Sequence, residues 1–76
     1  MKQIDIQELI PYLKDGWVAM DKCGIWYWSE KEPYTVKDFN GWLAEESRSA
    51  ILSIAFNIKP AKNWRKSLTK VENKDE

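Results

Sequence analysis

Residues 17–32, WVAMDKCGIWYWSEKE, carry the strongest structural pattern in the chain. Strand patterns at residues 17–22 and 25–32 meet at the turn sequence Asp21-Lys22-Cys23-Gly24. Gly24 suits the positive φ angle that many tight turns require. The segment therefore predicts two antiparallel strands joined by a short turn.

The second of these strands is apolar on both faces. Because side chains alternate along a strand, Trp26 and Trp28 point to one side and Ile25 and Tyr27 to the other. A strand in a small antiparallel sheet normally has one wet face. Either both sides of this strand are covered, or one side is a contact surface.

Two further strands are expected at residues 34–39 and 42–46. Asn40-Gly41 lies between them and is typical of a type I′ hairpin, in which both residues have positive φ. A two-residue loop would place Phe39 opposite Trp42 as an aromatic cross-strand pair.

Residues 50–58 alternate in the manner of a fifth strand. The pattern assigns alternate apolar side chains to the core: Leu52, Ile54, Phe56 and Ile58. The intervening residues, which include Ser53, are assigned to the opposite face.

Helical patterns occur near both ends of the chain. Asp5 and Glu8 have the spacing of a capping box, and Pro11 is expected to shorten or kink the helix that follows. Pro60 precedes apolar residues at helical spacing: Ala61, Trp64, Leu68 and Val71. The alternative is a turn around Trp64 that leads into a short strand at residues 67–71.

The predicted fold class is α+β. We expect a hairpin-linked sheet of about five strands in meander order, with an SH3-like barrel as one arrangement, flanked by short N- and C-terminal helices. Residues 1–71 are expected to form a single domain, and residues 72–76 a frayed acidic tail.

Composition excludes several classes of protein. The chain has one cysteine and no histidine, so a disulfide framework and a Cys/His zinc site are excluded. A lone cysteine fits a reducing compartment, and neither a signal peptide nor an apolar run of membrane-spanning length is evident. We therefore expect a cytoplasmic protein with no membrane contact, no metal and no cofactor.

The net charge of zero conceals an uneven distribution. Residues 1–47 carry a net charge of −4, residues 48–71 carry +6, and residues 72–76 carry −2. Such a division can complement itself within or between molecules, or present a basic face to an anion. Zero net charge argues against non-specific binding of duplex DNA, which depends on neutralising phosphates.

The chain has five tryptophans, more than the core of a domain of 76 residues needs. Exposed rings can stack on nucleobases, hold cations or anchor a protein partner. The candidate ligand-binding residues combine these rings with the basic segment: Trp26, Trp28, Tyr34, Trp42, Lys62, Trp64, Arg65 and Lys66.

Residues 13–34, LKDGWVAMDKCGIWYWSEKEPY, resemble small proteins carried by phages and prophages. The likeness lies in a Gly-Trp-Val strand, a glycine turn, an aromatic strand and Lys-Glu-Pro-Tyr. It implies a protein that acts stoichiometrically, either by sealing a host defence protein or by sequestering a nucleotide signal. It implies no role for any single residue.

No catalytic residue is predicted, because Cys23 lacks a histidine to activate it and no nucleophile–base arrangement is evident. The favoured function is that of a non-enzymatic binder of a protein partner or a nucleotide-like ligand, assembled as a homo-oligomer. Two alternatives are a single-stranded nucleic-acid-binding module and a structural accessory subunit with an aromatic assembly interface.

Overall fold

A computed structural model describes residues 2–46 and 48–73. Two hairpin strands, β1 (Gly16–Met20) and β2 (Trp26–Ser29), form the centre of a four-stranded antiparallel sheet. β3 (Ser49–Ile51) pairs with β2, and β4 (Thr69–Val71) pairs with β1, so the strand order is β3-β2-β1-β4. The α+β class is supported, whereas the predicted five strands and the SH3-like meander are not observed.

The predicted turn after β1 is confirmed. Gly24 has a φ of 90°, and an Asp21 carboxylate oxygen accepts hydrogen bonds from the backbone N–H groups of Cys23 and Ile25. The register pairs Val18 with Trp28 and Met20 with Trp26. These four side chains share the sheet face that forms the core.

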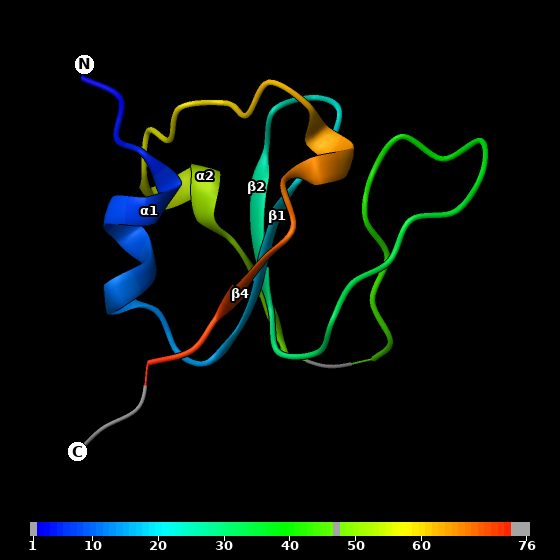
Figure 1. The fold of residues 1–76 in the computed structure, drawn as a ribbon, viewed down its shortest axis with the longest axis horizontal. Coiled ribbons are helices and arrows are strands. Elements are labelled where there is room, and N and C mark those ends of the chain that lie inside the picture. The colour runs from blue at the N-terminus through cyan, green and yellow to red at the C-terminus, as the bar shows by residue number, and fades with distance from the viewer. Residues whose placement is uncertain (1, 47, 74–76) are drawn as a thin grey trace.

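Two short helices, α1 (Ile6–Leu9) and α2 (Leu52–Ala55), lie on the core side of the sheet (Figure 1). The predicted capping box is present at Asp5, and a 3-10 turn, η1 (Ile10–Tyr12), follows α1 at Pro11. The core cluster joins these helices to the sheet: Ile6, Leu9, Val18, Met20, Trp26, Leu52, Ile58 and Val71.

The predicted strand at residues 50–58 is wrong beyond Ile51. The chain turns into α2, where the Phe56 N–H donates to the Leu52 carbonyl over 3.0 Å. One helical turn breaks the two-residue alternation, so the side chains of Ile54 and Phe56 are 81% and 41% exposed. Ser53 faces inward instead, and its Oγ accepts a hydrogen bond from the backbone N–H of Trp26 over 2.9 Å.

The predicted hairpin at Asn40-Gly41 is also wrong. Neither residue has a positive φ; Asp38 does, at 68°. In place of two strands the chain forms a loop, residues 33–46, closed by a single antiparallel bridge between Tyr34 and Leu43. Phe39 and Trp42 are therefore not cross-strand neighbours. This segment is hereafter called the covering loop.

At the C-terminal end, the alternative of a turn and a short strand is observed, and the helix is not. Asn63 caps a 3-10 turn, η2 (Trp64–Lys66), and β4 follows it. The Ser67 hydroxyl accepts from the Met20 N–H over 2.8 Å, which fixes η2 against β1. Asn73 is held as well, because its side-chain amide donates to the carbonyls of Ile10 and Leu13. The ordered fold thus extends past Val71, and residues 74–76 of the expected tail lie outside the described residues.

Candidate functional site

The covering loop lies on the opposite side of the sheet from α1 and α2 (Figure 1). Between the loop and the sheet is a cavity of about 390 Å³, hereafter called the recess. Its lining includes Ala19, Tyr27, Ser29 and Ser49 from the strands, and Phe39, Gly41, Trp42, Leu43, Glu45 and Glu46 from the loop. Both faces of β2 are therefore covered, one by the helices and the other by the loop.

Contacts with β1 and with the turn after it hold the covering loop in place. The Trp42 indole N–H donates to the Met20 carbonyl over 2.9 Å, and the Lys22 N–H donates to the Asn40 carbonyl over 3.3 Å. The Trp42 ring also meets the Trp64 ring edge to face, with 6.2 Å between centroids. These contacts fix one wall of the recess without any regular secondary structure.

The sheet side of the recess contains two hydroxyl groups: that of Tyr27, which has a hydrogen-bond partner, and that of Ser29, which has none among the described residues. Burial raises the pKa of Tyr27, and the neighbouring Asp21 raises it further through its charge and a side-chain hydrogen bond. Ser29 is 6% exposed, and its Oγ has no hydrogen-bond partner among the described residues. An unsatisfied buried hydroxyl is costly, and a bound ligand is one way to satisfy it.

The recess is lined by acids and by no bases. Its charged lining residues are Asp21, Glu45 and Glu46, and none of the described lining residues is a lysine or arginine. Within the described chain, no basic group lies at ion-pair distance from these three carboxylates. The lysines and arginines of residues 48–71 thus lie outside the recess.

The structure distributes the predicted aromatic site residues over different environments. Trp26 is 2% exposed and donates its indole N–H to the Lys59 carbonyl, so it is a core residue and not part of a ligand surface. Trp28 is half-buried, donates its indole N–H to the Lys14 carbonyl and also lines the recess. Trp42 lines the recess, while Tyr34 is exposed at the base of the covering loop.

The predicted basic residues lie around η2. Arg65 places its guanidinium 4.6 Å from the centroid of the Trp64 ring. Lys66, on the same turn, and Lys62, just before it, are exposed. Trp64 is half-buried. Its edge-to-face contact with Trp42 brings this basic surface next to the covering loop, although none of the four residues lines the recess.

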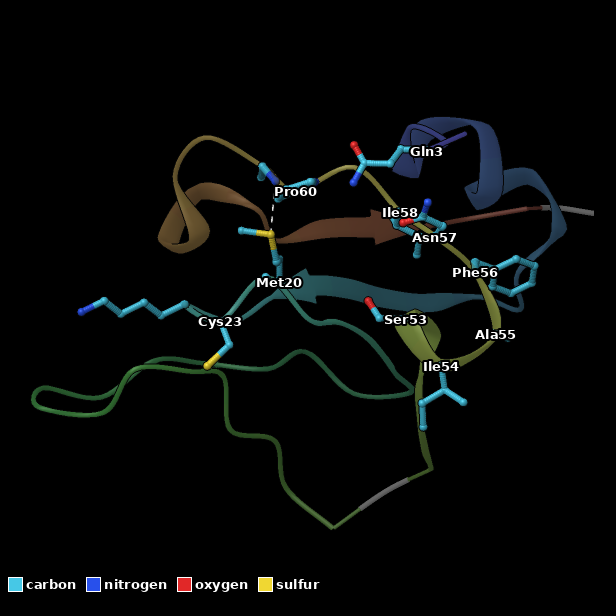
Figure 2. A pocket seen from close by; sticks show the side chains of 13 residues that line it. Gln3, Met20, Cys23, Ser53, Ile54, Ala55, Phe56, Asn57, Ile58 and Pro60 are labelled. Atoms are coloured by element: carbon cyan, nitrogen blue, oxygen red, sulfur yellow. Dashed lines mark hydrogen bonds between the residues drawn. The ribbon is translucent and has the colours of Figure 1, made fainter. Parts of the chain in front are cut away.

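A second depression, of about 700 Å³, lies between the β1–β2 turn and the segment that begins at α2. Figure 2 shows that its side chains do not converge, since Ile54 and Phe56 point in different directions and Met20 points toward Pro60. The Met20 sulfur accepts the Ala61 N–H over 3.2 Å. This depression is an open groove with no focus of polar groups.

Sequence reasoning missed the residues that complete the recess: Tyr27, Ser29, Phe39, Glu45 and Glu46. One signal could have found part of this set. The two apolar faces of β2 require cover on both sides, and Tyr27 is on the face away from Trp26. The carboxylates could not be found this way, because the sequence pattern assigns residues 42–46 to a strand.

Comparison of the chain with models of known protein families, with curated protein sequences and with solved structures finds no match in any of the three. In the described part of the chain, no helix is long and apolar enough to cross a membrane. The same residues contain no group of three or more acidic or cysteine side chains placed to hold a metal ion.

Proposed function

We propose that this chain is a small non-enzymatic binding protein that acts stoichiometrically, and that the recess is its binding site. One observation carries the proposal: a loop, instead of a helix or strands, covers the second face of the sheet and leaves a cavity of about 390 Å³. This volume lies within the roughly 300–1,000 Å³ typical of small-molecule sites. The same volume would accept one large side chain of a protein partner.

The recess has the mixture of groups that binding sites share. Aromatic rings of Tyr27, Phe39 and Trp42 supply apolar contact, and the Ser29 hydroxyl supplies an unused polar group. The loop is held by backbone and indole hydrogen bonds, so little ordering is needed on binding. Binding through a pre-formed site suits the stoichiometric sealing of a host defence protein that the likeness to phage-carried proteins implies.

A fragment screen by nuclear magnetic resonance tests this site. We expect small aromatic and aliphatic probes to shift the amide signals of Ala19, Tyr27 and Gly41 and the Trp42 indole signal. Trp42→Ala should abolish these shifts, whereas Tyr12→Ala should not, because Tyr12 is equally aromatic but lies outside the recess. Shifts confined to residues outside the recess, or no shifts with any probe, would refute the proposal.

A second candidate function is binding of a base-bearing anion or single-stranded nucleic acid at η2. The exposed cations Lys62, Arg65 and Lys66 beside the Trp64 ring favour it. The position of Arg65 over that ring weakens it, since a stacked base would have to displace the guanidinium or use the other face. Titration with mononucleotides and oligonucleotides at several salt concentrations tests it, because affinity for phosphates falls steeply as salt rises.

Self-association is proposed at the edge of the sheet. β3 is exposed along its whole length. Its last residue, Ile51, and the residues Ile54 and Phe56 that follow it are exposed and apolar. Antiparallel pairing of two identical edge strands is self-complementary about a two-fold axis, so the proposed occupant is a second copy. It would also cover the apolar side chains.

Sedimentation measures this association. We expect the parent chain to form a dimer at micromolar concentration and Ile54→Lys to be monomeric, since a buried lysine would oppose the contact. Tyr12→Lys is the control, because it makes the same charge change at a side chain that is 84% exposed elsewhere. A parent chain that sediments as a 9.0 kDa species at all concentrations would contradict the expectation.

A further inference from the structure

We infer that the recess binds a cation, namely an ammonium or guanidinium group on an aliphatic stem. The inference rests on the proposed function and adds the chemical class of the ligand. The expected charge of the ligand differs from the one that the sequence alone predicts. The sequence combines tryptophans with lysines and arginines and so favours an anion. In the structure, the ring-lined cavity and the basic residues are separate surfaces.

The charge of the lining carries the first step. The charged residues of the lining are Asp21, Glu45 and Glu46, and no lysine or arginine is among the described lining residues. None of the three is in an ion pair with a described residue. An anionic ligand would be repelled here, whereas a cation would receive charge-assisted hydrogen bonds.

The rings carry the second step. Tyr27, Phe39 and Trp42 line the same cavity, and cations are attracted to the faces of such rings, most strongly to indole. The aliphatic stem of a lysine, an arginine or a free amine would contact the apolar parts of these rings while its head group reaches the carboxylates. Acidic residues alone would not define a site, but here they line the same cavity as these aromatic rings.

The hydroxyl groups of Ser29, which is buried, and of Tyr27, which is partly exposed, carry the third step. Ser29 Oγ lies on the recess side of the sheet, since Ser29 is paired with Trp17 and lines the cavity. It lacks a partner among the described residues, and a small local movement would expose this shielded atom to an N–H donor. Tyr27, whose pKa is raised by its burial and by Asp21, stays protonated and neutral at physiological pH. The polar groups of the sheet side are thus compatible with a ligand that donates hydrogen bonds.

A pair of isosteric peptides tests the charge. Acetyl-Gly-Arg-Gly-amide and the same peptide with citrulline in place of arginine differ in charge and hardly in shape. We expect the arginine peptide to bind at least about tenfold more tightly, with shifts at Tyr27, Gly41 and the Trp42 indole. Ethylguanidinium supplies the free-cation arm. If ethylguanidinium binds as tightly as the arginine peptide, the natural ligand is a free small-molecule cation. If ethylguanidinium binds about tenfold more weakly, the natural ligand is a protein segment whose backbone adds contacts.

Variants that replace the glutamates of the recess with neutral glutamine test the role of their charge. Glu45→Gln combined with Glu46→Gln should remove most of the preference for arginine over citrulline. Glu30→Gln combined with Glu32→Gln is the matched control, because these two exposed glutamates change the net charge equally and do not line the recess. The control should keep the preference.

The outcomes separate the two proposals. Equal binding of both peptides at the recess overturns the inference and leaves the proposed function standing. Binding of neutral aromatic fragments at the recess, without binding of either cation, likewise overturns only the inference. A recess that responds to no peptide and to no fragment overturns both.

Discussion

Replacing Trp26 with alanine is expected to lower the free energy of unfolding by about 3–5 kcal/mol. The ring is the largest fully buried side chain of the described chain, and it packs among Val18, Met20 and Leu52. Its indole N–H also donates to the Lys59 carbonyl over 3.2 Å, which would lose its partner. Because small domains have a stability of only about 5–15 kcal/mol, Trp26→Ala should lose a large share of its stability and melt at a much lower temperature than the parent. Circular dichroism during thermal melting measures the effect.

Phe56→Ala is the matched control for this prediction. The sequence pattern assigns Phe56 to the core, but its side chain is 41% exposed in the structure. We therefore expect Phe56→Ala to cost less than half of what Trp26→Ala costs. A larger loss for Phe56→Ala would show that residues 52–58 form the alternating strand after all and that α2 is misplaced.

Gly16→Ala is expected to have the second-largest effect, a loss of about 1–3 kcal/mol from overpacking between the two central strands. A Cβ at this position would lie 2.5 Å from the Ser29 carbonyl oxygen and 2.9 Å from the Trp28 indole nitrogen. The first of these atoms is backbone and cannot rotate away, so β1 and β2 would have to separate at this end. Chemical denaturation of the purified variant measures the loss.

Gly41→Ala is the comparison that isolates the cause. A Cβ there would lie 3.3 Å from a ring carbon of Phe39, which is 44% exposed and free to turn. We expect a loss of at most about 0.5 kcal/mol, as for ordinary surface substitutions. Equal losses at the two glycines would show that backbone entropy, and not the carbonyl contact, is responsible.

The parts of the fold that are predictable from sequence are those set by neighbouring residues. The capping box at Asp5, the turn at Gly24 and the alternation of Trp26 and Trp28 each depend on a few adjacent positions. Such signals are strong because local geometry allows few alternatives. They establish α1 and the β1–β2 hairpin correctly.

The failures occur where distant contacts override a local pattern. Asn40-Gly41 is a strong hairpin signal, but the indole of Trp42 bonds to Met20 and draws the loop over the sheet. Similarly, the alternation of side chains along residues 50–58 is broken at Ser53, which accepts a hydrogen bond from the backbone N–H of Trp26. These two residues are 27 positions apart in the chain. Neither partner can be identified from a single sequence.

The candidate site is predictable only in part. Surplus indoles predict that aromatic residues do more than fill the core, and Trp28 and Trp42 are in both the predicted set and the lining of the recess. The charge of the site is not predictable, because the basic residues are adjacent to Trp64 in sequence while the acids reach the recess through the path of the covering loop. The sign of charge at a site follows from the tertiary fold.

The position of β4 bears on how the protein is made in the cell. β1 is a central strand of the sheet, yet its second neighbour consists of residues 69–71, which are made long after β1 and β2. Until those residues leave the ribosome, one edge of β1 lacks a partner and the core lacks Val71. Pairings between such distant positions also close late. The core should therefore stay incomplete until residues 69–71 have been made, and a chain that stops before residue 69 should be a target for proteases.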